Sequence, residues 1–292
     1  MRGTGDTGAR ANPEILPGKI MDDFASLPPA PISPSFRLGV TSYVYPADVL
    51  TNIRKLAPVV DDIEVVFFDS GEYSNFPSPG EIIEWRDIAA AHDLTYTIHF
   101  PLDRSLGSPD KGEREAGLTT ILGLVELCRP LNPHGYILHL EGIAADADAT
   151  RVRDWQKDMA PLLRLIAGIV DKPQQVCVEN TGYPFDWCEP ILAEFPFGVC
   201  LDFGHLWQMN YDWKAHVKKW LSRTRIIHLY GSDNTSRHYS LQKMPAPLVR
   251  EALKSIKDYS DVLTLETFGY EDTSSSLGTL SECVRHNTRA NA

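Results

Sequence analysis

Acidic and imidazole side chains stand directly after several short apolar runs of this sequence. The stretch "VCLDFGHLW" at residues 199–207 begins like a buried strand and then carries Asp202 and His205. Carboxylates and imidazoles together are a ligand mixture that suits Zn²⁺, Mn²⁺ and Fe²⁺. A single strand-end histidine or acid more often caps the next helix, so a metal site is predicted only if the whole set meets at one place. The other members of this set are His99, His139, Glu179, His228, His238 and Glu266.

The elements that must bring these residues together alternate regularly from residue 36 onward. Short β-branched runs begin near residues 36, 62, 94, 135, 175, 197, 225 and 262, and amphipathic stretches with helical spacing lie between them. Eight strands, each followed by a helix over about 250 residues, is the inventory of a (β/α)8 TIM barrel, an α/β fold. The C-terminal ends of all strands of such a barrel meet at one mouth, so the polar strand ends predict a single active site there.

The same pattern sets the expected domain organisation. Residues 1–35 are rich in Gly, Pro, Ala and Asp, and they predict an N-terminal tail because they bury little apolar surface. One barrel domain is expected over residues 36–285, followed by a C-terminal tail at 286–292. A doubly wound open sheet is the competing arrangement. It normally carries a glycine-rich phosphate loop after its first strand, and "GVTSYVYP" is not one.

Charge and cysteine usage narrow the classes of partner and compartment. The formal net charge of -11 argues against a protein that holds a nucleic-acid backbone, because that task requires clustered Lys and Arg. The five cysteines form no CxxC pair, and they predict reduced, buried thiols without a disulfide. We find no membrane span and no signal-peptide pattern, so we expect a cytoplasmic protein with no membrane partner. The oligomeric state stays open.

The strand endings "VENTG", "LDFGH", "IIHLYGSD" and "LTLET", with "IHFP" and "LHLEG" before them, resemble those of the xylose-isomerase-like barrels. That group includes sugar epimerases and metallophosphodiesterases of the endonuclease IV type. The resemblance spans residues 36–285. It implies one metal held by Glu179, Asp202, His228 and Glu266. In the phosphodiesterase branch it implies a second metal, held by His99 and His139, with Glu179 as the bridging carboxylate.

The endonuclease pattern also has a third metal, held by the histidine of "DxxH" and by an Asp-Arg-His triplet. His205 is present here, but the triplet reads Ser236-Arg237-His238. Because Ser236 replaces the expected acid, the resemblance leaves a third metal in doubt, although Asp233 is near enough in sequence to substitute. His205 and His238 are kept as candidate ligands. The choice among Zn, Mn and Fe stays open, since this ligand mixture suits all three.

A closer resemblance involves two long segments, "TSYVYPADVLTNIRKLAPVVDDIEVVFFDS" at residues 41–70 and "DLTYTIHFPLDRSLGS" at 93–108. Both are similar to the cobamide-remodelling phosphodiesterases. That family cleaves the nucleotide-loop phosphodiester of cobalamin-like corrinoids and leaves a cobinamide and a riboside phosphate. The resemblance therefore implies a metal-dependent hydrolase with a small-molecule corrinoid as its substrate.

Phosphodiester hydrolysis assigns further roles to residues around the mouth. We expect Glu179, Arg237 and His238 to be catalytic, and Arg237 to contact the phosphate because a planar guanidinium matches its geometry. Arg104 is a weaker candidate for substrate contact, since a surface charge explains it equally simply. A wide corrinoid favours an aromatic mouth, and packing of loops on the barrel is the competing explanation for these rings. The aromatic candidates are Tyr43, Tyr45, Phe68 and Trp207.

Three other functions stay open. A sugar isomerase or epimerase would use a single divalent metal, with Glu179 and Glu266 moving protons next to a carbonyl, and it would have no need of His99 and His139. DNA repair of the endonuclease IV type fits the ligand set but not the acidic charge. A non-catalytic corrinoid or metal carrier would need the same pocket without turnover, and it would not need a pair of metals that generates hydroxide.

Overall fold

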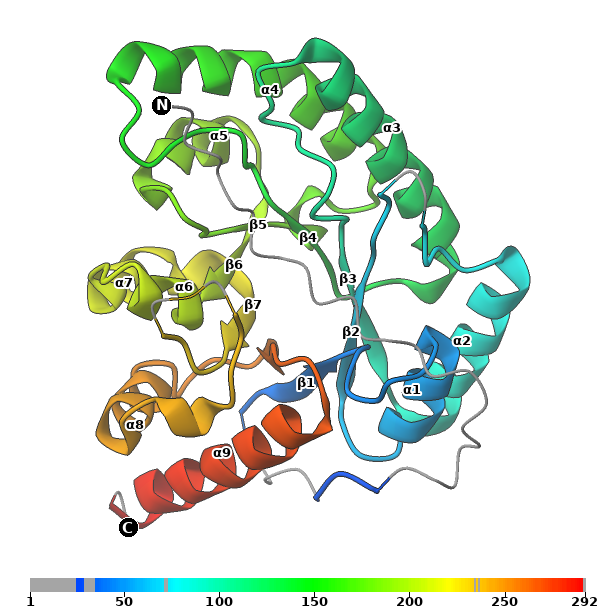
Figure 1. Ribbon diagram of the computed structural model, residues 1–292, viewed down its shortest axis with the longest axis vertical. Coiled ribbons are helices and arrows are strands. Elements are labelled where there is room, and N and C mark those ends of the chain that lie inside the picture. The colour runs from blue at the N-terminus through cyan, green and yellow to red at the C-terminus, as the bar shows by residue number, and fades with distance from the viewer. Residues whose placement is uncertain (1–24, 29–34, 71–72, 234, 236, 291–292) are drawn as a thin grey trace.

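Eight parallel strands close into one barrel in chain order, with β8 pairing back onto β1. The protein is seen here in a computed structural model, which describes residues 25–28, 35–70, 73–233, 235 and 237–290 (Figure 1). The predicted (β/α)8 TIM barrel is confirmed, and each strand lies on one of the apolar runs that predicted it. The strands are β1 (Arg37–Thr41), β2 (Asp62–Val66), β3 (Thr95–His99), β4 (Gly135–Leu138), β5 (Val176–Glu179), β6 (Gly198–Asp202), β7 (Thr224–Leu229) and β8 (Val262–Leu265).

Helices connect successive strands and surround the barrel (Figure 1). Their ends follow local sequence signals, as α2 (Pro79–His92) illustrates. Ser78 and Glu81 form a capping box at its start, and Asp93 adopts a left-handed conformation at its end. The other α-helices are α1 (Val49–Leu56), α3 (Lys111–Cys128), α4 (Ala149–Ile169), α5 (Glu189–Glu194), α6 (Phe203–Gln208), α7 (Trp213–Trp220), α8 (Ala246–Ser255) and α9 (Tyr270–Ala290). Short 3₁₀ helices are η2 (Arg129–Leu131), η3 (Pro173–Gln175), η4 (Phe185–Cys188), η5 (Leu221–Arg223) and η6 (Leu241–Lys243).

Residues 25–28, within the predicted N-terminal tail, pack on the barrel. Residues 1–24 and 29–34 of that tail lie outside the described residues. Within residues 25–28, Leu27 is buried, and the carbonyl oxygens of Ala25 and Ser26 accept hydrogen bonds at 3.0 and 3.1 Å. The donors are the hydroxyls of Tyr45, after β1, and Tyr270, at the start of α9. This short segment therefore belongs to the folded domain.

The C-terminal helix is longer than the sequence pattern indicates. α9 continues through residues 286–290, which the sequence analysis assigns to a tail. Asn287 Nδ2 donates a hydrogen bond to the Arg250 carbonyl at 3.0 Å, and this contact attaches the last turns of α9 to α8. None of the helices in the described part of the chain is long and apolar enough to cross a membrane.

The barrel strands are buried on both faces, because the helices cover their outer face and side chains fill the interior. All five residues of β6 are buried, for example. A small apolar cluster of Ile137, Cys177, Cys200 and Ile226 joins four neighbouring strands. All five cysteines are free and buried. This packing holds the strand ends in fixed positions relative to one another.

Candidate metal centre

The predicted ligands converge at the C-terminal ends of six strands. His99, Glu179 and Asp202 are the last residues of β3, β5 and β6, and His228 is the penultimate residue of β7. His139 and Glu266 come directly after β4 and β8. All of these side chains are buried except that of His139, which is 14% exposed. Parallel strands in register thus place ligand-type side chains from six sequence segments in one region.

Four of these residues, Glu179, Asp202, His228 and Glu266, offer ligand atoms that all lie within 4.8 Å of one another. We call them the four-residue group. His228 Nδ1 lies 3.0 Å from Glu266 Oε2 and 3.5 Å from both Asp202 Oδ2 and Glu179 Oε1. These four atoms are buried without a hydrogen-bond partner among the described residues. Buried polar atoms normally have partners, so a set of unpartnered atoms facing one another fits a divalent cation.

Asp202 has two tasks, which explains why a core strand ends in an acid. Its Oδ1 accepts a hydrogen bond from the backbone N–H of His205 at 2.6 Å and so caps the start of α6. Its Oδ2 is the oxygen that faces His228 Nδ1. The Asn180 side chain fixes the Asp202 backbone with two hydrogen bonds. Its Oδ1 accepts from the Asp202 N–H at 2.8 Å, and its Nδ2 donates to the Asp202 carbonyl at 2.9 Å. The strand-to-helix turn therefore orients one carboxylate oxygen toward the candidate metal.

A second set of ligand atoms comes from His99, His139 and Glu179, again within 4.8 Å of one another. We call it the three-residue group. Glu179 Oε2 accepts a hydrogen bond from His139 Nε2 at 2.8 Å and lies 3.7 Å from His99 Nε2. His99 Nδ1 donates to the Phe100 carbonyl at 2.8 Å, which leaves Nε2 for a ligand. Glu179 thus turns one oxygen to each group, as a bridging carboxylate does in a two-metal site.

The histidines and carboxylates of this site shift one another's pKa values. Burial alone would raise the pKa of Glu179, but the His139 and His228 imidazoles lower it well below its usual range. Burial would lower the pKa of His139, but the Glu179 and Glu141 carboxylates raise it well above its usual range. Without a metal, the pair is therefore an imidazolium and a carboxylate. A cation that displaced the proton shared by His139 and Glu179 could bind both side chains without a further change in protonation.

His205 and His238 lie beside the two groups but belong to neither of them. The Nδ1 atom of each donates to a backbone carbonyl: His205 to Asn180 at 3.0 Å and His238 to Glu266 at 3.1 Å. Their rings are adjacent, with centroids 6.0 Å apart. Burial lowers the pKa of His238 to about 4. Burial would also lower the pKa of His205, but the Asp202 and Glu179 carboxylates raise it to about 9. Their role as ligands of a third metal stays a prediction.

Two residues considered with that third metal, Asp233 and Arg237, are exposed and make local contacts. Asp233 is exposed, and its Oδ1 accepts hydrogen bonds from the backbone N–H and hydroxyl of Thr235 at 2.7 and 2.6 Å. It caps its own turn. Ser236 lies outside the described residues. Arg237 is exposed, with its guanidinium 5.1 Å from the ring centre of Tyr239.

The other predicted substrate contacts are largely occupied by packing. Arg104, half-buried, donates from Nε to Asp69 Oδ2 at 2.8 Å and so joins the loops after β3 and β2. Tyr45 is buried beneath the segment of residues 25–28. Trp207 is half-buried on α6 with its ring 5.6 Å from that of Phe203. Substrate contact by these three residues stays a prediction.

One aromatic pair remains close to the region expected to bind substrate. Tyr43 is buried and packs edge-to-face on Phe68, with 5.5 Å between ring centres. The Tyr43 hydroxyl accepts a hydrogen bond from Asn75 Nδ2 at 2.7 Å, which holds the loop after β2 against the end of β1. Phe68 is half-buried. Substrate contact by these two residues stays a prediction.

Three residues of the site escaped the sequence analysis. Glu64 lies within β2, is fully buried, and its Oε2 accepts a hydrogen bond from His228 Nε2 at 2.9 Å. Glu141 follows β4, with Oε1 3.4 Å from His139 Nδ1. Tyr230 stacks on His238 at 3.9 Å between ring centres. The signal for Glu64 was present, because an acid between apolar residues in the run "DIEVVFF" must find a buried partner.

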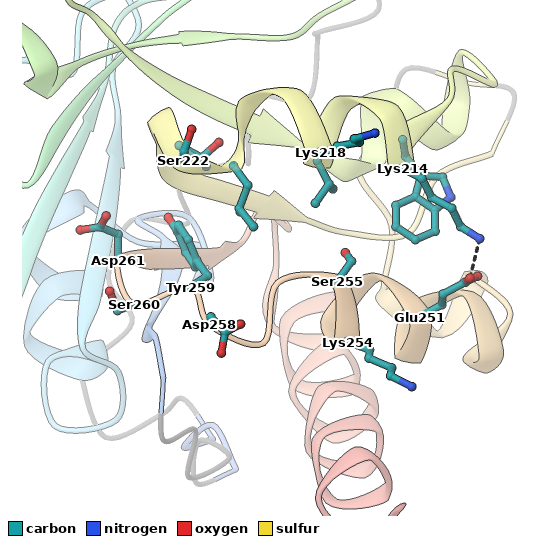
Figure 2. Close-up of a pocket in the computed structure, with 14 residues that line it drawn as sticks. Lys214, Lys218, Ser222, Glu251, Lys254, Ser255, Asp258, Tyr259, Ser260 and Asp261 are labelled. Carbon is teal, nitrogen blue, oxygen red and sulfur yellow. Dashed lines mark hydrogen bonds and ion pairs between the residues drawn. The ribbon is translucent and has the colours of Figure 1, made fainter. Parts of the chain in front are cut away.

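A prominent pocket of the barrel lies elsewhere. Figure 2 shows this cavity of about 1010 Å³ between α7 and α8, with Lys214 paired to Glu251 at its rim. Its lining includes Thr224 and Asp261, at the N-terminal ends of β7 and β8. The candidate metal ligands stand at the opposite ends of these strands. This pocket therefore takes no part in the site.

The fold and the ligand groups agree with the outcome of comparisons with known proteins. A family model described as xylose isomerase-like TIM barrel matches residues 55–285. The chain belongs to this family. No curated protein sequence matches this xylose isomerase-like barrel.

Solved structures that share the fold of this xylose isomerase-like barrel carry the names of several enzymes. A D-tagatose 3-epimerase-like protein is 17% identical with a TM-score of 0.73, over 88% of this chain and 100% of that one. D-psicose 3-epimerase from Clostridium cellulolyticum is 17% identical with a TM-score of 0.57, over 87% and 97%. Endonuclease IV from Thermus thermophilus is 22% identical with a TM-score of 0.61, over 84% and 99%. At these identities the likeness shows the fold alone.

Proposed function

We propose that this protein is a metal-dependent phosphodiesterase that hydrolyses the nucleotide-loop phosphodiester of cobamides to a cobinamide and a riboside phosphate. The observation that carries the proposal is the orientation of Glu179, whose two oxygens face two different sets of ligand atoms. A two-cation site is the arrangement that phosphoryl-transfer hydrolases use. The substrate class rests on the resemblance of residues 41–70 and 93–108 to the cobamide-remodelling family.

The residues of the chain have separable tasks in this proposal. Glu179 would hold both cations, the rest of the four-residue group one of them, and His99 and His139 the other. When bound, such a pair of cations lowers the pKa of a bound water to about 7 and neutralises charge on the phosphoryl oxygens. Arg237 would orient the phosphate through its planar guanidinium. His238 donates from Nδ1 to the Glu266 carbonyl, so its Nε2 is left to contact the phosphate or the leaving group.

The substrate would be a small molecule and not a nucleic acid. The net charge of -11 disfavours the phosphate backbone of DNA, although the endonuclease IV structure shares this fold. The second candidate is a one-metal sugar isomerase or epimerase, since structures with epimerase names share this fold. In that case Glu179 and Glu266 would move protons, and His99 and His139 would have no task.

The test is a cleavage assay with purified protein. The protein is loaded in separate reactions with Mn²⁺, Zn²⁺ or Fe²⁺ and incubated with adenosylcobalamin, and cobinamide is measured by chromatography. We expect release of cobinamide with at least one metal. Absence of cleavage with all three would reject the proposed activity.

A variant pair separates the two candidate functions. His139→Ala removes a ligand of the three-residue group and is expected to lower hydrolysis by roughly 100-fold or more, the upper range for loss of a metal-site group. His216→Ala on α7 is the matched control, because its ring hydrogen-bonds within its own helix. A ketose epimerase would instead retain its activity in His139→Ala. Isomerisation of ketohexoses by the wild type, unaffected by this variant, would favour the sugar enzyme.

A further inference from the structure

Glu64 is a buried carboxylate that belongs to no expected ligand set. It lies in the middle of β2, and its side chain is completely buried. Its Oε2 accepts a hydrogen bond of 2.9 Å from Nε2 of His228, which is also completely buried. β2 is bonded to β1 and β3, whereas β7 is bonded to β6 and β8. The Glu64–His228 hydrogen bond therefore crosses the interior of the barrel.

This bond determines which nitrogen of His228 faces the four-residue group. Nε2 carries the proton that Glu64 accepts, so a neutral His228 presents the lone pair of Nδ1. Nδ1 is the atom that lies 3.0 Å from Glu266 Oε2 and 3.5 Å from Asp202 Oδ2. Without Glu64, the proton would move to Nδ1, because that position is surrounded by carboxylate oxygens. A protonated Nδ1 cannot bind a cation.

We propose that Glu64 is a positioning residue, which fixes the tautomer and ring orientation of His228 so that Nδ1 binds the cation of the four-residue group. The inference rests on the metal site of the proposed function and holds for a hydrolase or an epimerase alike. Metal-binding histidines commonly donate their other ring N–H to a carboxylate, which also makes them more basic ligands. Glu141 stands in a similar relation to His139, with Oε1 3.4 Å from Nδ1, but it is half exposed.

A competing role for Glu64 follows from its second oxygen. Glu64, His99 and Glu266 also offer ligand atoms within 4.8 Å of one another, and Glu64 Oε1 is buried without a hydrogen-bond partner. Glu64 would then be a direct ligand. The hydrogen bond to His228 favours the positioning role, because a carboxylate already engaged at 2.9 Å is oriented toward the imidazole. The two roles predict different nitrogen signals for His228.

The experiment compares wild type, Glu64→Leu, Glu64→Gln and Asp62→Asn as full-length proteins. Asp62 is the matched control: it lies two residues earlier on the same strand, is completely buried, and accepts a hydrogen bond from Thr95 at 2.6 Å instead of contacting a ligand histidine. Zn²⁺ dissociation constants and stoichiometry are measured by competition with a chromophoric chelator. The tautomer of His228 is read from ¹⁵N chemical shifts of the zinc-loaded protein. Thermal melts of the metal-free proteins report folding.

We expect Glu64→Leu, which removes the acceptor of the His228 Nε2 proton, to weaken one of the zinc sites by roughly 10–100-fold, and Asp62→Asn to stay within about twofold of wild type. Glu64→Gln keeps the shape of the side chain and an amide oxygen that can accept this proton, so it should retain most of the zinc affinity that Glu64→Leu loses. Wild-type His228 should be protonated at Nε2 and bound through Nδ1. Equal zinc affinity in wild type and Glu64→Leu, a His228 without a proton on Nε2, or wild-type protein that binds no zinc would overturn the inference. The proposed hydrolase is tested apart from it, because release of cobinamide with Mn²⁺ or Fe²⁺ does not depend on zinc binding.

Discussion

Replacing Asp62 by Asn should stabilise the protein above neutral pH. Asp62 is completely buried in the barrel, and burial raises the pKa of its carboxyl from 3.8 to about 7, although the Thr95 and Thr97 side chains oppose the change. The folded state therefore holds a proton that the unfolded state releases, so stability falls as the pH rises from about 4 to 7. At about 1.4 kcal/mol for each pKa unit, the gap between 3.8 and about 7 corresponds to a cost of about 4 kcal/mol in the free energy of folding.

The assay is urea unfolding of metal-free wild type and Asp62→Asn at pH 4 and pH 8. The amide oxygen of Asn can still accept the Thr95 hydroxyl, so the variant removes the charge and keeps the contact. We expect an advantage of about 2–4 kcal/mol at pH 8 that largely disappears at pH 4. Asp258→Asn, at an exposed carboxylate, controls for the change in net charge. A variant no more stable at pH 8, or equally favoured at both pH values, would refute the reasoning.

Three further outcomes are expected from the site and its support. Gly204→Ala places a Cβ 2.1 Å from Cζ of Tyr230, and this overpacking should lower the free energy of unfolding by about 1–3 kcal/mol, measured by urea unfolding. An unchanged stability would show that the Tyr230 ring can move away without cost. Removal of metal by a chelator should lower the melting temperature, since a ligand at 1,000 times its dissociation constant adds about 4 kcal/mol to the free energy of unfolding. A melting temperature that changes neither with chelator nor with added Zn²⁺ would contradict a metal centre. Metal affinity should rise with pH, because binding must displace the proton of His139, whose pKa Glu179 raises well above its usual range against the effect of burial. Equal zinc affinity in titrations at pH 6 and pH 8 would speak against His139 as a ligand.

The barrel was predictable because its strands are covered on both faces. Such strands appear as uninterrupted apolar runs, like "FGVCLDFGH", and eight of them separated by helical segments leave few other topologies. The ends of the chain were less predictable. Leu27 is buried within a stretch whose composition indicates a tail, and α9 continues past Arg285 because Asn287 is bound to α8. Both outcomes depend on single tertiary contacts that leave no periodic pattern.

The positions of the candidate ligands were predictable for a related reason, whereas the roles of the residues around them were not. Parallel strands in one barrel must end at the same rim, so a polar residue closing each run points to a common site. Sequence offers no such rule for Glu64, which acts from the middle of a strand through a bond across the barrel. Nor does it show that Arg104 is neutralised by Asp69 or that Tyr45 is covered by residues 25–28. These facts depend on how loops fold back on the barrel.

The choice between one and two cations can be argued from the buried polar atoms. A one-metal enzyme would account for the four-residue group but would leave His99 and His139 beside Glu179 Oε2 without a task. Burying an imidazole is costly unless it is satisfied by a partner, and His99 Nε2 lies 3.7 Å from Glu179 Oε2, which is beyond hydrogen-bonding distance. A second cation bound to both imidazoles and to that oxygen would satisfy all three atoms at once. The hydrolase proposal therefore accounts for more of the buried polar groups than the epimerase does.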